Sequence, residues 1–333
     1  MVKVIAEIAQ GYEGNYKQAE LLLRAAIKAG ADAIKYQLVI ADEFCTQDYI
    51  HYQLFRSLEM DEEQWGNLVN VAAAEGREIH FDVFGHGSLS LATSVNADAI
   101  KVHATDMGNI GLLESVAESR VNAVCLGVGG AFLPEIERAV SIFAGKELCL
   151  MAGFQGYPTR EEDNQIGRLN FLNRHFSDAE NVSYGFADHS SPDTALSYAI
   201  PAVAIGAGAT TLEKHITLGR VLELEDFESA LNPDQFAQFT HCIRKCGTVL
   251  GRTDEAASDL GMSQPELEYR QKTRKHAVAC KALKIGAEIT MHDIALKRTA
   301  ATEAFTDVAL LYGRKLIQGI QMNQPFQEYH FER

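Results

Sequence analysis

The sequence predicts an α/β protein built on a (β/α)8 barrel and followed by a small β-rich domain. Strand-like apolar runs alternate with amphipathic helical stretches through most of the 333 residues, and eight such runs precede the point where the alternation stops. Two of the last runs deliver a histidine at their carboxyl ends, at His189 and His215. Barrel enzymes build their active sites at the carboxyl ends of the strands, so the pattern predicts an enzyme.

The candidate strands are short and rich in Val, Ile and Ala, as expected for parallel strands that are covered on both faces. They lie at residues 3–9, 33–39, 78–84, 99–104, 123–128, 147–153, 182–188 and 210–217. Eight strand and helix units in succession favour a closed barrel over an open doubly wound sheet. The run Gly127-Val-Gly-Gly130 lacks the third glycine of a dinucleotide-binding fingerprint.

Helix signals separate these strands. A periodic stretch at 16–29 ends before Gly30, and one at 61–75 begins with Asp61 and Gln64 at capping-box spacing. The last barrel helix is expected to open at Asn232-Pro233, an N-cap followed by proline in the first turn.

The composition changes after residue 250. Residues 1–251 are predicted to form the barrel, 252–274 a charged linker, and 275–333 a small domain of short β segments. Within that domain a short helix is expected to start at Thr290 and a strand to end at Lys297 and Arg298. A piece of this size is marginal by itself, so we expect it to pack on a barrel, its own or a partner's.

Charge and cysteine usage limit the class of protein. The net charge of −15 disfavours nucleic acid and anionic membranes as partners. The six cysteines are scattered, and Cys242 and Cys246 lack further ligands at metal spacing, which favours reduced thiols. No apolar run could span a bilayer and the chain begins directly as a strand, so a cytoplasmic location is expected.

Polar residues two apart along a strand point to the same face, which places several ionisable groups inside the predicted barrel. The pairs are Lys35 with Gln37, Lys101 with His103, and Glu213 with His215. Charges buried without a function would be costly. Two lysines can neutralise an anionic substrate, and two imidazoles beside Asp188 and Glu213 form half of a divalent-metal site.

Seven motifs, in register along nearly the whole chain, resemble the sialic acid synthase family. They are Ala6-Glu-Ile-Ala-Gln-Gly-Tyr-Glu-Gly14, Ala33-Ile-Lys-Tyr-Gln37, Ala99-Ile-Lys101, Tyr157-Pro-Thr159, Gly185-Phe-Ala-Asp-His-Ser190, Leu212-Glu-Lys-His-Ile-Thr217 and Leu231-Asn-Pro233. The tail at 281–298 resembles the antifreeze-like (SAF) β-clip domain that closes those enzymes.

The resemblance implies condensation of phosphoenolpyruvate with the aldehyde of an open-chain N-acyl hexosamine, giving a nonulosonic acid and phosphate for surface or spore-coat polysaccharide. It implies a Mn²⁺ or Mg²⁺ ion on His189 and His215, and a domain-swapped homodimer in which Arg298 reaches the partner's sugar. Lys35 and Lys101 would hold the phosphate and carboxylate of phosphoenolpyruvate. The other implied catalytic residues are Glu7 and Asp188, and the substrate-binding residues are Gln37, Asp82, Asp106, Gln155, Tyr157, Asp226 and Arg298.

The chain departs from the family at four positions where hydroxyl groups typically bind the phosphate, which are Asp82, Ala104, Gly127 and Ala187. Each lost hydrogen bond to the anion would remove about 1.5–3 kcal/mol of binding. Backbone N–H groups at 127–130 are one possible replacement. Three interpretations therefore stay open: a nonulosonic acid synthase, a barrel aldolase or lyase with a different keto-acid donor, and a non-catalytic sugar-acid binding protein.

Each assigned residue also has a purely structural alternative. The two histidines could be hydrogen-bonded core residues, and the lysines could form buried ion pairs with Glu7 or Asp106. Tyr157 could close a turn, Asp226 could lie on a solvated acidic loop, and Arg298 could be an ordinary surface residue.

Overall fold

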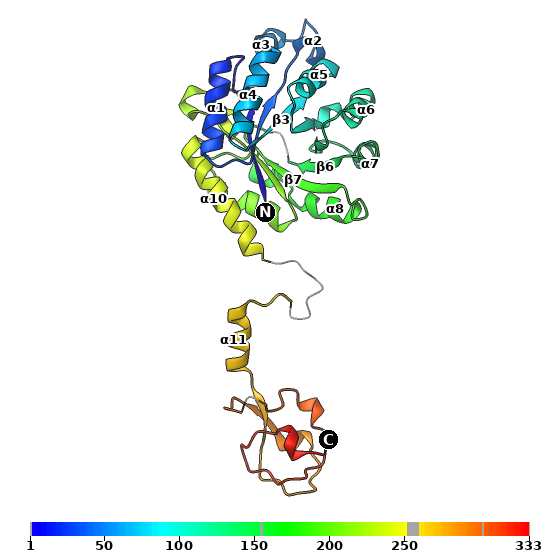
Figure 1. Ribbon diagram of the computed structural model, residues 1–333, viewed down its shortest axis with the longest axis vertical. Coiled ribbons are helices and arrows are strands. Elements are labelled where there is room, and N and C mark those ends of the chain that lie inside the picture. Colours follow the sequence, from blue (N-terminus) through cyan, green and yellow to red (C-terminus); the bar gives the residue numbers. More distant parts are fainter. Residues whose placement is uncertain (1, 154–155, 252–259, 302, 333) are drawn as a thin grey trace. The chain divides into compact units, whose positions relative to one another are not determined.

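The computed structural model describes residues 2–153, 156–251, 260–301 and 303–332 (Figure 1). The chain divides into two compact units, Met1–Gly251 and Arg252–Arg333, and each is described by itself. Gln155 and residues 252–259 of the predicted linker lie outside the described residues.

The first unit is a closed barrel of eight parallel strands, which confirms the predicted fold class. The strands are β1 Lys3–Ala9, β2 Ala33–Gln37, β3 Glu78–Val83, β4 Ala99–Val102, β5 Ala123–Gly127, β6 Glu147–Ala152, β7 Val182–Asp188 and β8 Thr211–His215. Each strand pairs with the next, and β1 also pairs with β8, where Glu7 lies opposite His215. The carboxyl ends of all eight strands consequently meet at one end of the barrel.

Helices surround this barrel (Figure 1). They are α1 Tyr16–Lys28, α2 Ala41–Phe44, α3 Tyr52–Ser57, α4 Glu62–Ala74, α5 His86–Ser94, α6 Ile110–Glu118, α7 Leu133–Ile142, α8 Gly167–His175, α9 Ala199–Gly206 and α10 Pro233–Leu250. The start of α4 has the expected capping box, in which Asp61 and Gln64 bond each other's backbone N–H groups. Gly30, just after α1, has a φ of +88°, which only glycine adopts without strain.

Side chains that point outward from the strands pack against the helices. Trp65 of α4 contacts Tyr12, Tyr36 and Phe81 edge to face, with ring centroids 5.3–5.5 Å apart. A separate apolar cluster of buried strand residues consists of Ile5, Ala33, Cys125, Cys149, Met151 and Ala187.

The second unit has its own small core and a helix that the sequence interpretation did not include. The helix is α11, Gln264–Thr273, which lies in the stretch interpreted as linker and begins with a capping box between Ser263 and Glu266. Strand β9, His276–Ala279, pairs antiparallel with β10, Ile294–Lys297. The buried residues of this unit include Ala277, Ile289, Leu311, Leu316, Ile320, Phe326 and Phe331.

Within both units, no helix of the described chain is long and apolar enough to cross a membrane.

Candidate active site

Five charged side chains meet inside the carboxyl end of the barrel. This lysine–carboxylate cluster consists of Glu7, Lys35, Asp82, Lys101 and Glu213, from β1, β2, β3, β4 and β8, and each residue is at most 2% exposed. Lys35 donates two hydrogen bonds of 3.0 Å to Asp82, forms an ion pair with Glu7, and lies 3.1 Å from Glu213 Oε2. Lys101 donates a 2.6 Å bond to Glu213 Oε1. The lysine charges are thus already compensated within the protein.

The pKa values of two carboxyl groups in the cluster, Glu7 and Glu213, shift in opposite directions. Burial raises the pKa of Glu7 to about 8, although Lys35 opposes the shift. Glu213 is equally buried, but Lys101 and Lys35 together hold its pKa well below its usual range. Burial disfavours the charged form of Lys35, yet the surrounding carboxylates raise its pKa well above the usual value. Near pH 7 Glu7 is therefore the member of the cluster that most readily carries a carboxyl proton.

Two imidazoles lie beside this cluster at the ends of β7 and β8. The ring centroids of His189 and His215 are 5.2 Å apart, and the ring of Tyr157 stands edge-on to both, at 5.2 and 5.7 Å. Burial lowers the pKa of His189 to about 3 and that of His215 well below its usual range, so both rings are neutral. His189 Nδ1 and His215 Nε2 are buried and have no hydrogen-bond partner among the described residues.

Unpartnered, neutral, buried imidazole nitrogens are what a divalent cation requires of protein ligands. Among the described residues no group of three or more His, Cys, Asp and Glu side chains is placed to hold a metal. The histidine pair by itself therefore offers two such nitrogens, His189 Nδ1 and His215 Nε2.

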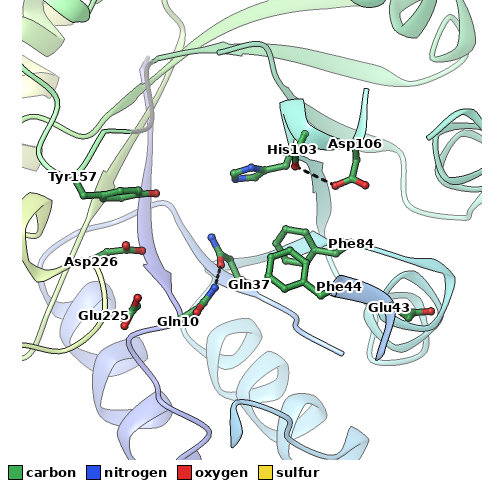
Figure 2. A pocket seen from close by; sticks show the side chains of 11 residues that line it. Gln10, Gln37, Glu43, Phe44, Phe84, His103, Asp106, Tyr157, Glu225 and Asp226 are labelled. Atoms are coloured by element: carbon green, nitrogen blue, oxygen red, sulfur yellow. Dashed lines mark hydrogen bonds between the residues drawn. The ribbon is translucent and has the colours of Figure 1, made fainter. Parts of the chain in front are cut away.

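Above the cluster, a cavity of about 530 Å³ opens at the end of the barrel. In Figure 2, Tyr157, Asp226 and Glu225 line one side and Phe44, Phe84 and His103 the other, with the hydroxyl of Tyr157 and the ring of His103 pointing inward. Gln10 Nε2 donates a 2.7 Å bond to Gln37 Oε1 at the cavity wall. Burial lowers the pKa of His103 to about 4, which keeps this ring neutral as well.

The mouth of the cavity is acidic. The described residues that line it include Glu43, Asp106, Glu225 and Asp226 but no lysine or arginine. Burial raises the pKa of Asp226 to about 7, and repulsion from Glu225 and Glu228 adds to the shift. Glu43 differs because its carboxylate accepts bonds from the backbone N–H groups of Gly87 and Ser88 at the start of α5. Among the described lining residues, therefore, an anion held at this mouth would find no lysine or arginine to pair with.

The structure brings most of the predicted site residues to this end of the barrel. Glu7, Lys35, Asp82 and Lys101 form the cluster, and Gln37, Asp106, Tyr157 and Asp226 line the cavity. Asp226 Oδ2 lies 3.9 Å from His215 Nδ1. Asp188 instead bonds the backbone N–H and hydroxyl of Ser190 and forms a 3.2 Å ion pair with Lys214.

Two further predicted parts of the site do not line this cavity. Arg298 belongs to the second unit, where it is exposed and its Nε donates a 3.3 Å bond to the carbonyl of Thr273. Gly129 and Gly130, considered as phosphate-binding backbone, line a separate cavity of about 400 Å³ beside α7 and α8. The alternative pairing of the lysines is partly observed, because Lys35 contacts Glu7, whereas the Asp106 side chain bonds Thr105 and Asn109.

Sequence reasoning missed several residues of the site. Glu213 contacts both lysines of the cluster but was considered only as a neighbour of His215. His103 was not among the predicted site residues, although it shares a strand face with Lys101 and lines the cavity. The two-residue spacing to assigned residues was the available signal in both cases. Glu43 and Phe44 are brought to the cavity by the short helix α2 and carried no such signal, whereas Phe84, just after β3, lies two residues from Asp82.

Comparison with known proteins agrees with this geometry. Residues 22–255 match the model of the NeuB family. The chain is 24% identical over 350 residues to the N,N'-diacetyllegionaminic acid synthase of Legionella pneumophila, covering 99% of this chain and 94% of that protein.

Solved structures give the same relationship. The N-acetylneuraminic acid synthetase of Leptospira borgpetersenii, crystallised with citrate, superposes with a TM-score of 0.72 at 27% identity, over 82% of this chain and 92% of that one. The spore coat polysaccharide biosynthesis protein SpsE of Bacillus subtilis superposes with a TM-score of 0.66 at 25% identity, over 100% of this chain and 95% of that one. The chain therefore belongs to the NeuB family and is an enzyme of the sialic acid synthase type.

Proposed function

We propose that this enzyme condenses phosphoenolpyruvate and one water molecule with the open-chain aldehyde of a neutral N-acyl hexosamine, forming a nonulosonic acid and phosphate. The observation that carries the proposal is the convergence of two lysines and two neutral, unpartnered histidines at the carboxyl end of the barrel. The lysines supply positive charge for the donor, and the histidines supply ligands for Mn²⁺ or Mg²⁺.

In this proposal His189 and His215 hold the cation through their unpartnered nitrogens. When bound, the ion polarises the aldehyde oxygen, where negative charge develops as the new carbon–carbon bond forms. Tyr157, which stands edge-on to both rings, limits the space beside them and holds the sugar against the site.

The donor is placed by Lys35 and Lys101. Because both ammonium groups already contact carboxylates, a phosphoenolpyruvate anion must displace or share the contacts with Asp82 and Glu213. Glu7, protonated near neutral pH, is placed to donate a proton to the departing phosphate oxygen through a bound water or directly. Asp188 has a positioning role in this scheme, since its bonds to Ser190 and Lys214 fix the loop that follows β7.

The acceptor occupies the acidic mouth of the cavity. The part of its lining that the structure describes has four carboxyl groups and no lysine or arginine, so a hexosamine that carries a phosphate group would meet repulsion there. A neutral N-acyl sugar can instead bond Gln37, Tyr157 and Asp226 through its hydroxyl groups and pack on Phe44 and Phe84. Surface or spore-coat polysaccharide is the expected destination of the product.

For the second unit we propose an antifreeze-like (SAF) fold and a homodimer in which Arg298 contacts the acceptor bound by the partner subunit. The supports are the antiparallel pair of β9 and β10 and the exposure of Arg298 at the end of β10. Arg298→Ala is expected to raise the KM for the sugar and leave the KM for phosphoenolpyruvate unchanged. Sedimentation velocity on the full chain tests the dimer.

A second candidate is an aldol-type condensation with a less charged keto acid such as pyruvate. It is favoured by the two hydrogen bonds that tie Lys35 to Asp82, which reduce the positive charge available to a phosphate. The two candidates share the acceptor and the metal site and differ only in the donor.

The test is release of phosphate from phosphoenolpyruvate by the full chain with Mn²⁺, in the presence of N-acetylmannosamine, its 6-phosphate, or a diacetamido-trideoxy hexose. Release that depends on a neutral sugar, is weaker with the 6-phosphate and is lost in His215→Ala supports the proposal. Product formed from pyruvate but not from phosphoenolpyruvate would establish the second candidate. No product from either donor, with the cation bound, would refute both.

A further inference from the structure

A cavity of about 560 Å³ in the second unit is distinct from the barrel site. One wall is the face of α11 that carries Leu267, Arg270 and Arg274, and the opposite wall comes from the start of β9 and the loop after β10. The residues that line it are Leu267, Arg270, Gln271, Arg274, His276, Thr299, Ala301 and Thr306. Of these described residues, three are basic and none is acidic.

Arg270 lies in the last turn of α11 and Arg274 caps its carboxyl end, and both side chains line the cavity. Neither forms an ion pair with a described residue. Like charges at this spacing destabilise a helix slightly. The helix dipole favours cations in the last turn of α11, which explains why basic residues occur there. It does not explain why the two arginines line a cavity.

His276 provides an independent indication of a ligand. It is the first residue of β9, is only 8% exposed and lines the cavity, yet its Nδ1 is buried without a hydrogen-bond partner among the described residues. A buried polar atom without a partner costs about 1–3 kcal/mol, and a ligand oxygen in the cavity would remove that cost. The hydroxyl-bearing Thr299 and Thr306 offer further donors on the same wall.

We propose that this cavity binds the phosphoryl group of a small phosphorylated metabolite. Paired guanidinium groups with an imidazole and hydroxyl groups are the donor set that proteins use for phosphate. The volume is within the range of small-molecule sites and exceeds what a bare phosphate ion fills, so an organic group can lie against Leu267 and Ala301. The inference is independent of the reaction proposed for the barrel.

The test uses the full chain with ¹⁵N-labelled histidine, and the His276 signals are assigned by their loss in His276→Asn. Inorganic phosphate, glucose 6-phosphate and glucose are titrated at low salt. We expect saturable shifts of the His276 signals with glucose 6-phosphate, weaker binding of inorganic phosphate, and no shift with glucose. Tighter binding of inorganic phosphate than of glucose 6-phosphate would mean that the cavity binds the free ion, and would overturn the proposal that its ligand is a phosphorylated metabolite.

Matched double variants in and just after α11 separate a specific site from general basic charge. Arg270→Gln with Arg274→Gln is expected to weaken the affinity at least tenfold. Lys272→Gln with Lys275→Gln, which removes the same charge outside the cavity, is expected to change it less than twofold. Equal losses in both variants, or His276 signals that never move, would refute the site. Glucose 6-phosphate binding that persists in Lys101→Met would place the binding site outside the barrel.

Discussion

Replacing Lys35 by methionine is the most direct test of the lysine–carboxylate cluster. The ammonium group contacts Glu7, Asp82 and Glu213, all buried, so its loss leaves carboxylates without compensation. Removing one partner of a buried ion pair typically costs about 3–5 kcal/mol. Protonation limits this cost, because neutralising a carboxylate of ordinary pKa near 4 takes about 4 kcal/mol at pH 7 and about 1.4 kcal/mol less for each lower pH unit.

We therefore expect Lys35→Met to lower the free energy of unfolding of the barrel by about 4 kcal/mol at pH 7 and by about 1–2 kcal/mol at pH 5. Glu7 contributes little to the loss of stability in Lys35→Met at pH 7, because its pKa of about 8 already keeps most of it protonated. The chain has a single tryptophan, Trp65, packed between α4 and the barrel, so urea unfolding followed by its fluorescence reports on the barrel alone.

Two further variants control this experiment. Lys28→Met removes a charge from the exposed end of α1 and is expected to change the stability by less than about 0.5 kcal/mol. Lys35→Met with Asp82→Leu replaces the pair by apolar groups and is expected to recover much of the loss. A loss below about 1 kcal/mol at pH 7, or one that is the same at pH 5, would refute the electrostatic interpretation of the cluster.

Three further predictions concern the donor, the metal and the second unit. Asp82→Asn weakens the hold on Lys35 and is expected to lower the KM for phosphoenolpyruvate about tenfold; an increase would mean that Asp82 itself contacts substrate. His215→Ala is expected to abolish stoichiometric Mn²⁺ binding in equilibrium dialysis, whereas His175→Ala on α8 retains it; retention in both would move the metal elsewhere. Bonds from Thr290 and the ion pair with Lys281 lower the pKa of Asp293 to about 2. The stability that the ionised Asp293 contributes to the second unit is therefore complete above its usual pKa and is lost as the pH falls from about 4 to 2. Asp293→Asn is expected to cost about 1–2 kcal/mol at pH 7 and nothing at pH 2, measured by amide exchange in the second unit; a cost independent of pH would contradict this account.

Much of the barrel was predictable because its signals are local. Seven of the eight strands start at the predicted residue and none ends more than two residues early, since short runs of buried β-branched residues between capped helices have few alternatives. The missed helix α11 also carried a local signal in Ser263 and Glu266, but its polar, charged sequence has no apolar stripe, and composition alone suggested a linker.

The sequence by itself determined the order of the elements, the family, and the strand ends at which Lys35, Lys101, His189 and His215 appear. Only the tertiary structure decided what those groups contact. The closure of β1 on β8 places Glu213 between both lysines, and the loop after β8 brings Asp226 close to His215. These pairings join residues distant along the chain, and neither propensity nor periodicity encodes them, because side-chain contacts across a barrel depend on how all eight strands close together.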